Sequence, residues 1–367
     1  MNISAISTKY KQTIKPRIPF IPQKTTAQSR TKGYNKILTS DVISRYSLSN
    51  VEKTKQRRKR IAIAIGSALL IAGATIFAYW AAIRSGEKFV LKTYADKSRQ
   101  DINKKTLIRG IQDNLKPVQL KTSEGNNIEC WDINPLNHKQ YVLFCHGNGQ
   151  NLTQSQDVYK KILNHGYGVL AVDYSGYSNN TGSVTEKNLI ADGKAAYDYL
   201  IKEKKISSQK IGIMGYSLGG AVATDVASKN DCKFLILLDT FNNLTDVIRN
   251  SPEYFSQNKV SKWATKLLNK FPSYMFPIKN SFKSDQKIKN VKAPITIIHA
   301  VDDHVIPYDL AKKLKNNAPP KNLNFRTLPE GGNRHFYDAA KMKAIDEALI
   351  HHHNLDIDIK RAPMISA

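Results

Sequence analysis

The sequence predicts an α/β fold with a mainly parallel sheet and helices on both of its faces. From about residue 116 onward, short apolar runs alternate with amphipathic segments, a pattern typical of a parallel sheet that is covered on both sides. Ahead of this region the chain carries a basic tail and a long uncharged apolar run. The sequence therefore predicts a membrane anchor followed by a globular domain.

Six apolar runs are the predicted strands: QYVLFCHG, YGVLAVDYSGY, KIGIMGYS, FLILLDT, PITIIHAV and NLNFRTL. Five segments between and after them are the predicted helices: VYKKILNHG, TEKNLIADGKAAYDYLIKEK with a Thr cap, LGGAVATDVASK, YDLAKKLKNNA and a final helix over 337–350. Ligands of such sheets bind at the carboxyl ends of the strands. The reactive side chains are therefore expected in the loops that follow the strands.

The chain divides into five predicted parts. They are a basic, disordered tail (1–60), a transmembrane helix (61–83), a juxtamembrane connector (84–115), the α/β domain (116–350, with an irregular insert at about 242–290) and a C-terminal tail (351–367). The first tail is rich in Ser, Thr, Lys and Pro, a composition that predicts disorder.

The uncharged run 61–83 is long enough to cross a membrane as a helix. Its 23 residues would extend roughly 34 Å, against about 30 Å of hydrocarbon. Tyr79 and Trp80 lie near one end, where interfacial aromatic side chains are common. A cleaved signal peptide is disfavoured, because the run starts far from the N-terminus and is too long for a signal-peptide core.

The net charge of +26 is concentrated in residues 1–60, which hold 15 Lys and Arg but 2 Asp and Glu. Such a tail could bind nucleic acid or an anionic membrane. The run KTKQRRKR directly before the apolar segment favours a topology signal, with the N-terminus in the cytoplasm and the domain across the membrane. We therefore expect no specific nucleic-acid partner. A mitochondrial transit peptide is a further alternative, against which the prolines of the tail argue.

No metal or organic cofactor is expected. The three cysteines, Cys130, Cys145 and Cys232, lack the spacing of zinc ligands or of a disulfide framework. They therefore leave open whether the protein lies in an oxidising or a reducing compartment. The tract His351, His352 and His353 could bind a metal, but the solvated end of a helix is the favoured interpretation.

The candidate nucleophile is Ser217, which lies between a predicted strand and a predicted helix in the sequence GYSLGG. The pattern G-x-S-x-G in this context forms a sharp turn that projects a serine hydroxyl above the sheet. Gly215 and Gly219 allow the strand and the helix to approach closely. The amide of Leu218, at the helix N-terminus, points to where an oxyanion would develop. A turn serine without chemistry is the weaker alternative.

A serine nucleophile needs a base and a group that orients the base. The segment IIHAVDDHVIP offers Asp302 and Asp303 for the second role, and LPEGGNRHFY offers His335 for the first. The order Ser, Asp, His is that of α/β-hydrolases. His299 and His304, which flank the acids, are expected to be incidental. A turn-forming role for the two acids stays open.

Residues 116–350 resemble the membrane-anchored branch of the α/β-hydrolase superfamily, the BEM-type abhydrolase-domain serine hydrolases. Four segments carry the resemblance: FCHGNGQN, VDYSGYSNNTGSVTEKNLIADGKAAYDYL, GYSLGG and HAVDDHVIP. The resemblance implies an α/β-hydrolase fold in which Asp303 is the acid and the Asn148 amide is a second oxyanion donor beside Leu218. An ordinary turn at Asn148 is the alternative. Ser175 and Ala300 depart from the arginine and the glycine that the family usually has there.

The resemblance also implies that the insert at about 242–290 is a lid. Its large side chains would suit an acyl chain or would simply pack the lid onto the core. These side chains are Tyr254, Phe255, Trp263, Phe271, Tyr274, Met275 and Phe276.

Together these features predict a single-pass membrane serine hydrolase of the carboxylesterase, lipase or acyl-protein thioesterase type. Ser217 would attack an ester, thioester or amide carbonyl, and water would hydrolyse the acyl-enzyme. Acyl groups of lipids or lipidated proteins are favoured, since the anchor keeps the domain at a bilayer. The alternative is a catalytically inactive adaptor that binds membrane or protein partners. A targeted effector or organelle protein is a third hypothesis.

Overall fold

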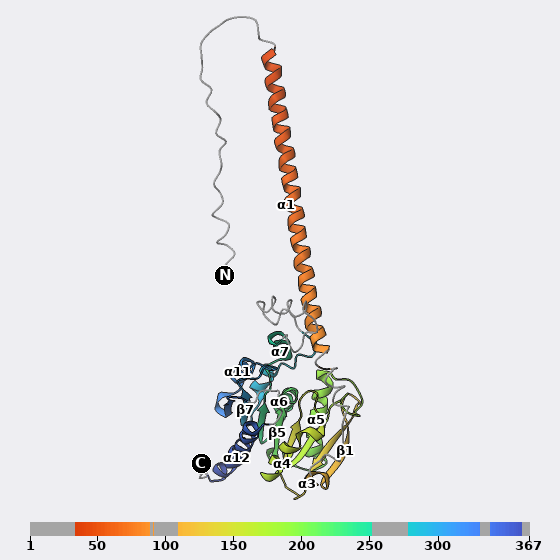
Figure 1. Ribbon diagram of the computed structural model, residues 1–367, viewed down its shortest axis with the longest axis vertical. Helices are drawn as coiled ribbons and strands as arrows, with labels where there is room; N and C mark the ends of the chain where they lie inside the picture. The colour runs from red at the N-terminus through yellow and green to blue at the C-terminus, as the bar shows by residue number, and fades with distance from the viewer. Residues whose placement is uncertain (1–33, 89–90, 92–108, 252–277, 331–337, 362–367) are drawn as a thin grey trace, which may run out of the picture. The chain divides into compact units, whose positions relative to one another are not determined.

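The computed structural model describes residues 34–88, 91, 109–251, 278–330 and 338–361; Figure 1 shows their arrangement. Two compact units, Met1–Ile71 and Ala72–Ala367, divide the chain, and the second contains the sheet. The described strands are β1 (Leu115–Lys121), β2 (Asn127–Ile133), β3 (Tyr141–Cys145), β4 (Gly168–Val172), β5 (Ile211–Tyr216), β6 (Phe234–Leu238), β7 (Ile295–Ala300) and β8 (Leu323–Leu328).

The strands of the described residues form one eight-stranded sheet in the order β1-β2-β4-β3-β5-β6-β7-β8. Strand β2 is antiparallel to its neighbours β1 and β4, and the remaining pairs are parallel. The predicted mainly parallel sheet is confirmed. Strands β1 and β2 were not predicted. In β1 half-buried and exposed positions are mixed, and Pro117 lies in it, which an edge strand tolerates.

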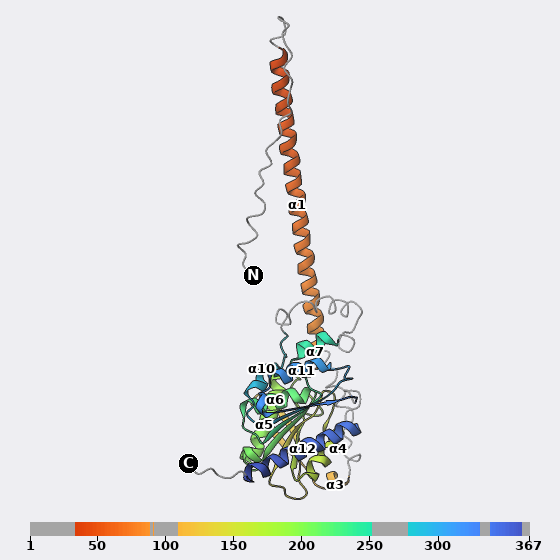
Figure 2. The same ribbon diagram turned by 90° about the vertical axis from the view of Figure 1, so that its left-hand side faces the viewer.

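Helices cover both faces of the sheet, as predicted. Figure 2 shows α4 and α12 on one side of it and α5, α6 and α10 on the other. The described helices are α1 (Tyr34–Lys88), α3 (Arg109–Gln112), α4 (Gln156–Asn164), α5 (Glu186–Lys202), α6 (Leu218–Lys229), α7 (Leu244–Asn250), α10 (Ser284–Lys287), α11 (Tyr308–Asn317) and α12 (Ala339–Arg361).

The core consists of two apolar clusters, one on each face of the sheet. Strands β3 to β7 are buried along their whole length. Successive side chains point to opposite faces, so Ile213 belongs to the cluster under α5, α6 and α11, and Met214 to the cluster under α4 and α12. Burial on both faces explains why these strands are continuous apolar runs rather than alternating ones.

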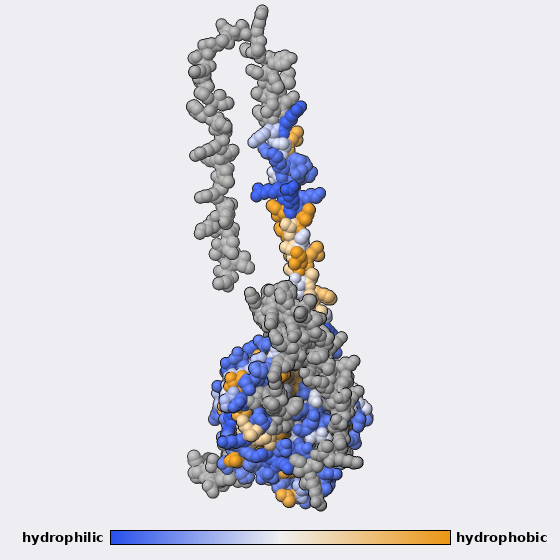
Figure 3. Space-filling model, viewed as in Figure 1, coloured by the Kyte–Doolittle hydropathy of each residue, from blue (hydrophilic) through white to orange (hydrophobic). Residues whose placement is uncertain are grey.

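Helix α1 corrects the predicted disordered tail over residues 34–60, which are helical; residues 1–33 lie outside the described part of the chain. Lys, Arg and Gln are good helix formers, and the stretch contains no proline before the apolar run continues it. The segment Ser44–Ala78 is long and apolar enough to cross a membrane, with a mean hydropathy of 2.3 in its most apolar window and 0% of that window buried. Figure 3 shows an apolar band on α1, next to a hydrophilic band that lies nearer the N-terminal end of the helix. The helix fits the predicted span at 61–83.

The last helix also differs from the prediction, because α12 continues to Arg361 instead of ending at residue 350. The histidine tract therefore lies within the helix, and the expected solvated end is wrong for His352. This side chain is 3% exposed, stacks on Phe234 and places Nε2 2.9 Å from the Thr296 hydroxyl. Burial lowers its pKa to about 3, helped by the nearby His351, Lys233 and Arg326.

The predicted connector 84–115 begins inside α1, and a buried carboxylate joins that end of the helix to the domain. Glu87 Oε1 accepts hydrogen bonds from the Asn280 backbone N–H (2.7 Å) and from its side-chain amide (2.5 Å). The Asn280 side-chain oxygen accepts from the N–H of Glu186 (2.7 Å), the first residue of α5. Glu186 in turn accepts from the Phe282 N–H (2.8 Å) and from Lys287 (3.1 Å). This network connects α1, α5 and the segment before α10.

The buried His352 should make the protein less stable in acid. Its folded pKa lies below its unfolded value, so its contribution to stability is present above about pH 6.5 and is lost as the pH falls. Between pH 7.5 and 5.5 this contribution should fall by about 1.3 kcal/mol. The raised pKa values of Asp192 and Asp303 favour the folded state in acid, but they act alike in the wild type and in His352→Gln. Urea unfolding of the two solubilised full-length proteins at both pH values should therefore show stability changes that differ by about 1.3 kcal/mol, with the wild type the less favoured in acid.

The matched control is His353→Asn, since His353 is exposed on the same helix. It should retain the wild-type difference between the two pH values. An unchanged difference in His352→Gln would contradict the assignment.

Candidate active site

Ser217 occupies the corner between β5 and α6 in a backbone conformation that is rare for residues other than glycine. Its φ is 52° and its ψ is −116°, so the corner stores strain. The Ser217 N–H donates to the Leu238 carbonyl (2.8 Å), and its own carbonyl accepts from the Gly220 N–H (3.0 Å) and the Thr240 hydroxyl (2.8 Å). These bonds hold the half-buried serine at the carboxyl edge of the sheet.

The glycines around Ser217 are required by the closeness of the backbones at this corner. A Cβ on Gly215 would lie 2.4 Å from the Gly219 carbonyl oxygen, and a Cβ on Gly219 would lie 2.1 Å from the Cys145 carbonyl oxygen. Neither backbone could move without breaking the strand-to-helix connection. The structure therefore gives the predicted G-x-S-x-G turn the geometry that its spacing implies.

The two candidate oxyanion donors come from adjoining segments. Leu218 is the first residue of α6 and is buried, so its amide lies at the positive end of the helix. The loop of Asn148 begins directly after Cys145, the residue that Gly219 touches. The amide of Gly147 donates to the Gln150 side chain (2.7 Å).

The buried side chains of His146 and Asp173 hold the start of the Asn148 loop in place. The His146 ring places Nε2 3.0 Å from Asp173 Oδ1 and Nδ1 2.9 Å from the Gly147 carbonyl oxygen. The Tyr174 hydroxyl donates to the His146 carbonyl (2.8 Å), and the Tyr177 hydroxyl donates to Asn148 Oδ1. The loop is thus held at a backbone carbonyl and at a side chain, as a preorganised oxyanion site requires.

Asp303 differs from Asp302 in the way that an orienting acid should. Asp302 is exposed, whereas Asp303 is 4% exposed and its Oδ1 accepts from the N–H groups of Val305 and Ile306, both at 2.8 Å. Its Oδ2 is buried and makes no hydrogen bond to the described residues. Burial and, after it, the charge of Asp239 raise the pKa of Asp303 to about 6, against lowering by the Ile306 and Val305 amides and by His299.

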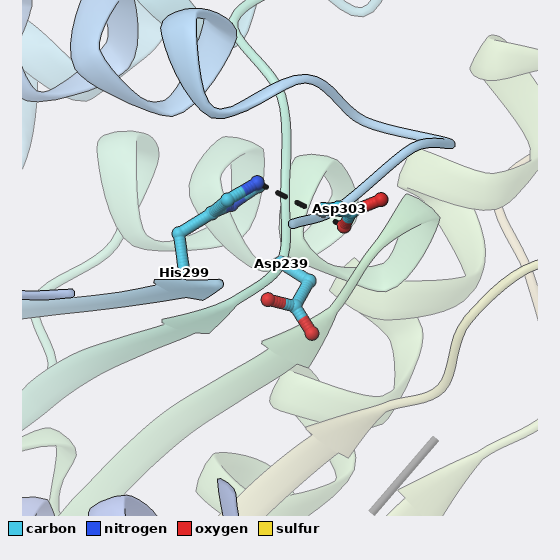
Figure 4. Close-up of side chains that lie close together, drawn as sticks. All are labelled: Asp239, His299 and Asp303. Atoms are coloured by element: carbon cyan, nitrogen blue, oxygen red, sulfur yellow. Dashed lines mark ion pairs between the residues drawn. The ribbon is translucent and has the colours of Figure 1, made fainter. Parts of the chain in front are cut away.

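Two side chains beside Asp303 were not predicted to belong to the site. The ligand atoms of Asp239, His299 and Asp303 all lie within 4.8 Å of one another, and Figure 4 shows the His299 ring facing Asp303. His299 Nε2 is 3.8 Å from Asp303 Oδ2 and 2.9 Å from the Ile306 carbonyl oxygen, so His299, which was expected to be incidental, lies beside the acid. The exposed His304 stays outside the cluster.

Asp239 follows the apolar strand β6, the same signal that singled out the acids after β7. Two carboxylates and an imidazole could in principle bind a divalent metal. However, the Nζ of Lys341 lies 2.5 Å from Asp239 Oδ2, with both side chains fully buried. An ammonium at this oxygen supplies the positive charge that a metal would supply, and the cluster is better described as an ion-paired acid site.

Several predicted positions lie outside the described residues: His335, and Tyr254, Phe255, Trp263, Phe271, Tyr274, Met275 and Phe276 of the insert. The two departures from the family pattern are described. Ser175 donates to Asp192 through its N–H (2.7 Å) and its hydroxyl (2.8 Å). Ala300 is buried at the end of β7, where its N–H faces Asp239 Oδ1 at 3.3 Å. Both positions are therefore buried and hydrogen-bonded to a carboxylate.

Comparison with known families places the fold. Residues 137–287 match the family described as Serine aminopeptidase, S33; the match includes Ser217 and ends before Asp303. Among solved structures, an alpha-beta hydrolase from Vibrio vulnificus aligns with a TM-score of 0.55 at 19% identity, over 75% of this chain and 92% of that one. The chain has the α/β-hydrolase fold. Esterase Pf2001 of Pyrococcus furiosus aligns with a TM-score of 0.51 at 18% identity, over 67% of this chain and 90% of that one.

Two curated relatives are more similar in sequence than these solved structures. Lysophosphatidylserine lipase ABHD12 of Xenopus tropicalis is 28% identical over 225 residues, or 58% of this chain and 55% of the relative. The alpha/beta hydrolase domain-containing protein aho-3 of Caenorhabditis elegans is 28% identical over 201 residues, or 54% of each chain. This chain thus spans about half the length of the relatives that it matches. The similarities support a hydrolase.

The strain at Ser217 predicts that two substitutions of similar size will differ in stability. Ser217→Gly should raise the free energy of unfolding by about 1 kcal/mol, since glycine adopts a positive φ without steric cost. Ser217→Ala keeps Cβ and hence the strain, so its stability should stay near that of the wild type. Thermal unfolding of the three proteins in the same detergent measures the difference. Equal stability of the two variants would contradict a strained corner.

Proposed function

We propose that the protein is a membrane-anchored serine hydrolase that cleaves an ester, thioester or amide with the triad Ser217, His335 and Asp303. The observation that carries the proposal is the strained, half-buried Ser217 between the two closely packed glycines. A serine fixed in this way costs folding stability and is typical of a nucleophile. The oriented, desolvated carboxylate of Asp303 supports the assignment.

In this mechanism, His335 takes the proton from the Ser217 hydroxyl as the oxygen attacks the carbonyl carbon. The oxyanion of the tetrahedral intermediate accepts hydrogen bonds from the amides of Asn148 and Leu218. His335 then gives the proton to the leaving group, and the same groups act on water to release the acid. The buried Oδ2 of Asp303 would accept the second ring N–H of His335, because no described residue occupies it.

The substrate that we propose is an acyl ester of a lipid. Helix α1 fits a membrane span, which would raise the local concentration of substrates in the bilayer. The frog relative is named a lysophosphatidylserine lipase, so lysophospholipids are the first lipids to test. The basic run before the span supports an N-terminus in the cytoplasm and the α/β domain on the opposite side.

The nucleophile assignment predicts covalent labelling by a fluorophosphonate probe. The solubilised full-length protein should react, and Ser217→Ala should lose both labelling and ester hydrolysis while it stays folded. Ser228→Ala is the matched control, since Ser228 lies on α6 and bonds only to the Asp225 carbonyl in the described structure; it should label like the wild type. A wild-type protein that does not label would indicate an adaptor instead of an enzyme.

The acid assignment predicts unequal effects of two neighbouring substitutions. Asp303→Asn should lower kcat by a factor on the order of ten thousand, because the imidazole loses the group that sets its tautomer, whereas Asp302→Asn should change it little. In the wild type, kcat/KM should fall as the pH drops through about 6, since Asp303 takes up a proton there. Assays with a p-nitrophenyl ester between pH 5 and 8 test both statements. Equal losses in the two variants would show that Asp303 is not the acid.

A further inference from the structure

The buried ion pair of Asp239 and Lys341 joins three parts of the site. Asp239 follows β6 with φ 41°, its N–H donates to the Ile298 carbonyl (2.9 Å), and its Oδ1 accepts from the Ala300 N–H (3.3 Å). These bonds fix its carboxylate between β6 and β7, beside Asp303. Its other oxygen holds Lys341, a residue of α12.

Lys341 also reaches the nucleophile side of the site. Its Nζ lies 5.5 Å from the centre of the Tyr216 ring, and Tyr216 directly precedes Ser217. A Cβ on Gly147 would lie 2.6 Å from this same ring, so Tyr216 is in contact with the loop of the proposed oxyanion donor. One ammonium group thus lies between the acid, the nucleophile corner and the oxyanion loop.

The position of Lys341 in the chain connects it to the proposed base. Lys341 lies six residues after His335 in the sequence, in the first turn of α12, where its N–H donates to Asp338 Oδ1 (2.8 Å). The ion pair therefore holds the beginning of α12 against the end of β6. A fully buried charge pair is weak as a source of stability, because desolvation opposes the attraction. Its placement at the site suggests a different role.

We propose that the Asp239–Lys341 ion pair is a positioning element of the proposed triad, which fixes the start of α12 at the end of β6 and sets the charge beside Asp303. The inference rests on the proposed hydrolase function. The carboxylate of Asp239 pairs with the Lys341 ammonium, and the charge of Asp239 raises the pKa of Asp303. The pair thereby sets the acid limit of the reaction and fixes the start of α12, which follows His335 in the sequence.

The titratable groups that face the acid pair come from each element packed around it. In the described structure they are Tyr216 of β5, His299 of β7 and Lys341 of α12, and Tyr308 of α11 lies behind His299 at a ring distance of 6.1 Å. Within the acid pair, the charge of Asp239 raises the pKa of Asp303; of the groups that face the pair, His299 lowers it.

The test is the pH dependence of kcat/KM for a p-nitrophenyl ester with solubilised full-length protein. Asp239→Asn keeps the shape, and asparagine tolerates a positive φ; the double variant Asp239→Asn with Lys341→Met removes both charges. The apparent pKa of the acid limb, which belongs to the coupled acid and base, should fall in the order wild type, double variant, Asp239→Asn. The total shift should be roughly one pH unit. Both variants should also lose at least tenfold in kcat at pH 8.

Lys343→Met is the matched control, because Lys343 is exposed on the same helix; its pH profile and kcat should equal those of the wild type. A lower kcat with an unshifted acid limb would overturn the proposal and leave the pair with a packing role only. If the double variant does not fold, the shift in Asp239→Asn decides alone. Fluorophosphonate labelling of the wild type separates these outcomes from a failure of the hydrolase assignment, which would abolish labelling as well.

Discussion

The corner between β5 and α6 is the constraint on which the site depends. There the helix begins so close to the end of β3 that a single methyl group on Gly219 would meet the Cys145 carbonyl at 2.1 Å. The closeness forces Ser217 into its positive φ and directs its side chain out of the sheet. It also brings the start of α6 beside the Asn148 loop, so that one packing contact places the hydroxyl and both candidate oxyanion amides.

Around this corner the protein buries an unusual amount of charge. Asp173 is matched by His146, and Asp239 by Lys341, whereas Asp303 retains one oxygen without a hydrogen bond to any described residue. Buried carboxylates are costly unless they are paired. The paired ones fix the positions of the loops between which the chemistry is proposed to occur, and the incompletely paired one keeps an acceptor for a catalytic partner.

The sequence predicted the parts of the fold that depend on continuous apolar runs and on special backbone positions. Strands β3 to β8 and the turn at Ser217 belong to this class. Strand β1 was missed because its stability comes from pairing with β2 rather than from its own pattern. The same limit applies to His352, which is buried because Phe234 and Thr296 meet it from distant strands. Asp239 could have been identified as a site candidate, because it is an acid directly after a buried strand. Its pairing with a lysine could not, since that lysine lies about a hundred residues away in the sequence.

The hydrogen bonds of Glu87 have a consequence for how the anchor is attached. A flexible linker would let a helix turn about its own axis without effect on the domain. Here the final turn of α1 is bound through a buried carboxylate to Asn280, and through it to the first residue of α5. Each residue of an α-helix turns the chain by about 100°. The Glu87 carboxylate therefore meets Asn280 in one rotational setting of this last turn, and a rotation of the turn by a single residue step about the helix axis would break both hydrogen bonds that Glu87 accepts.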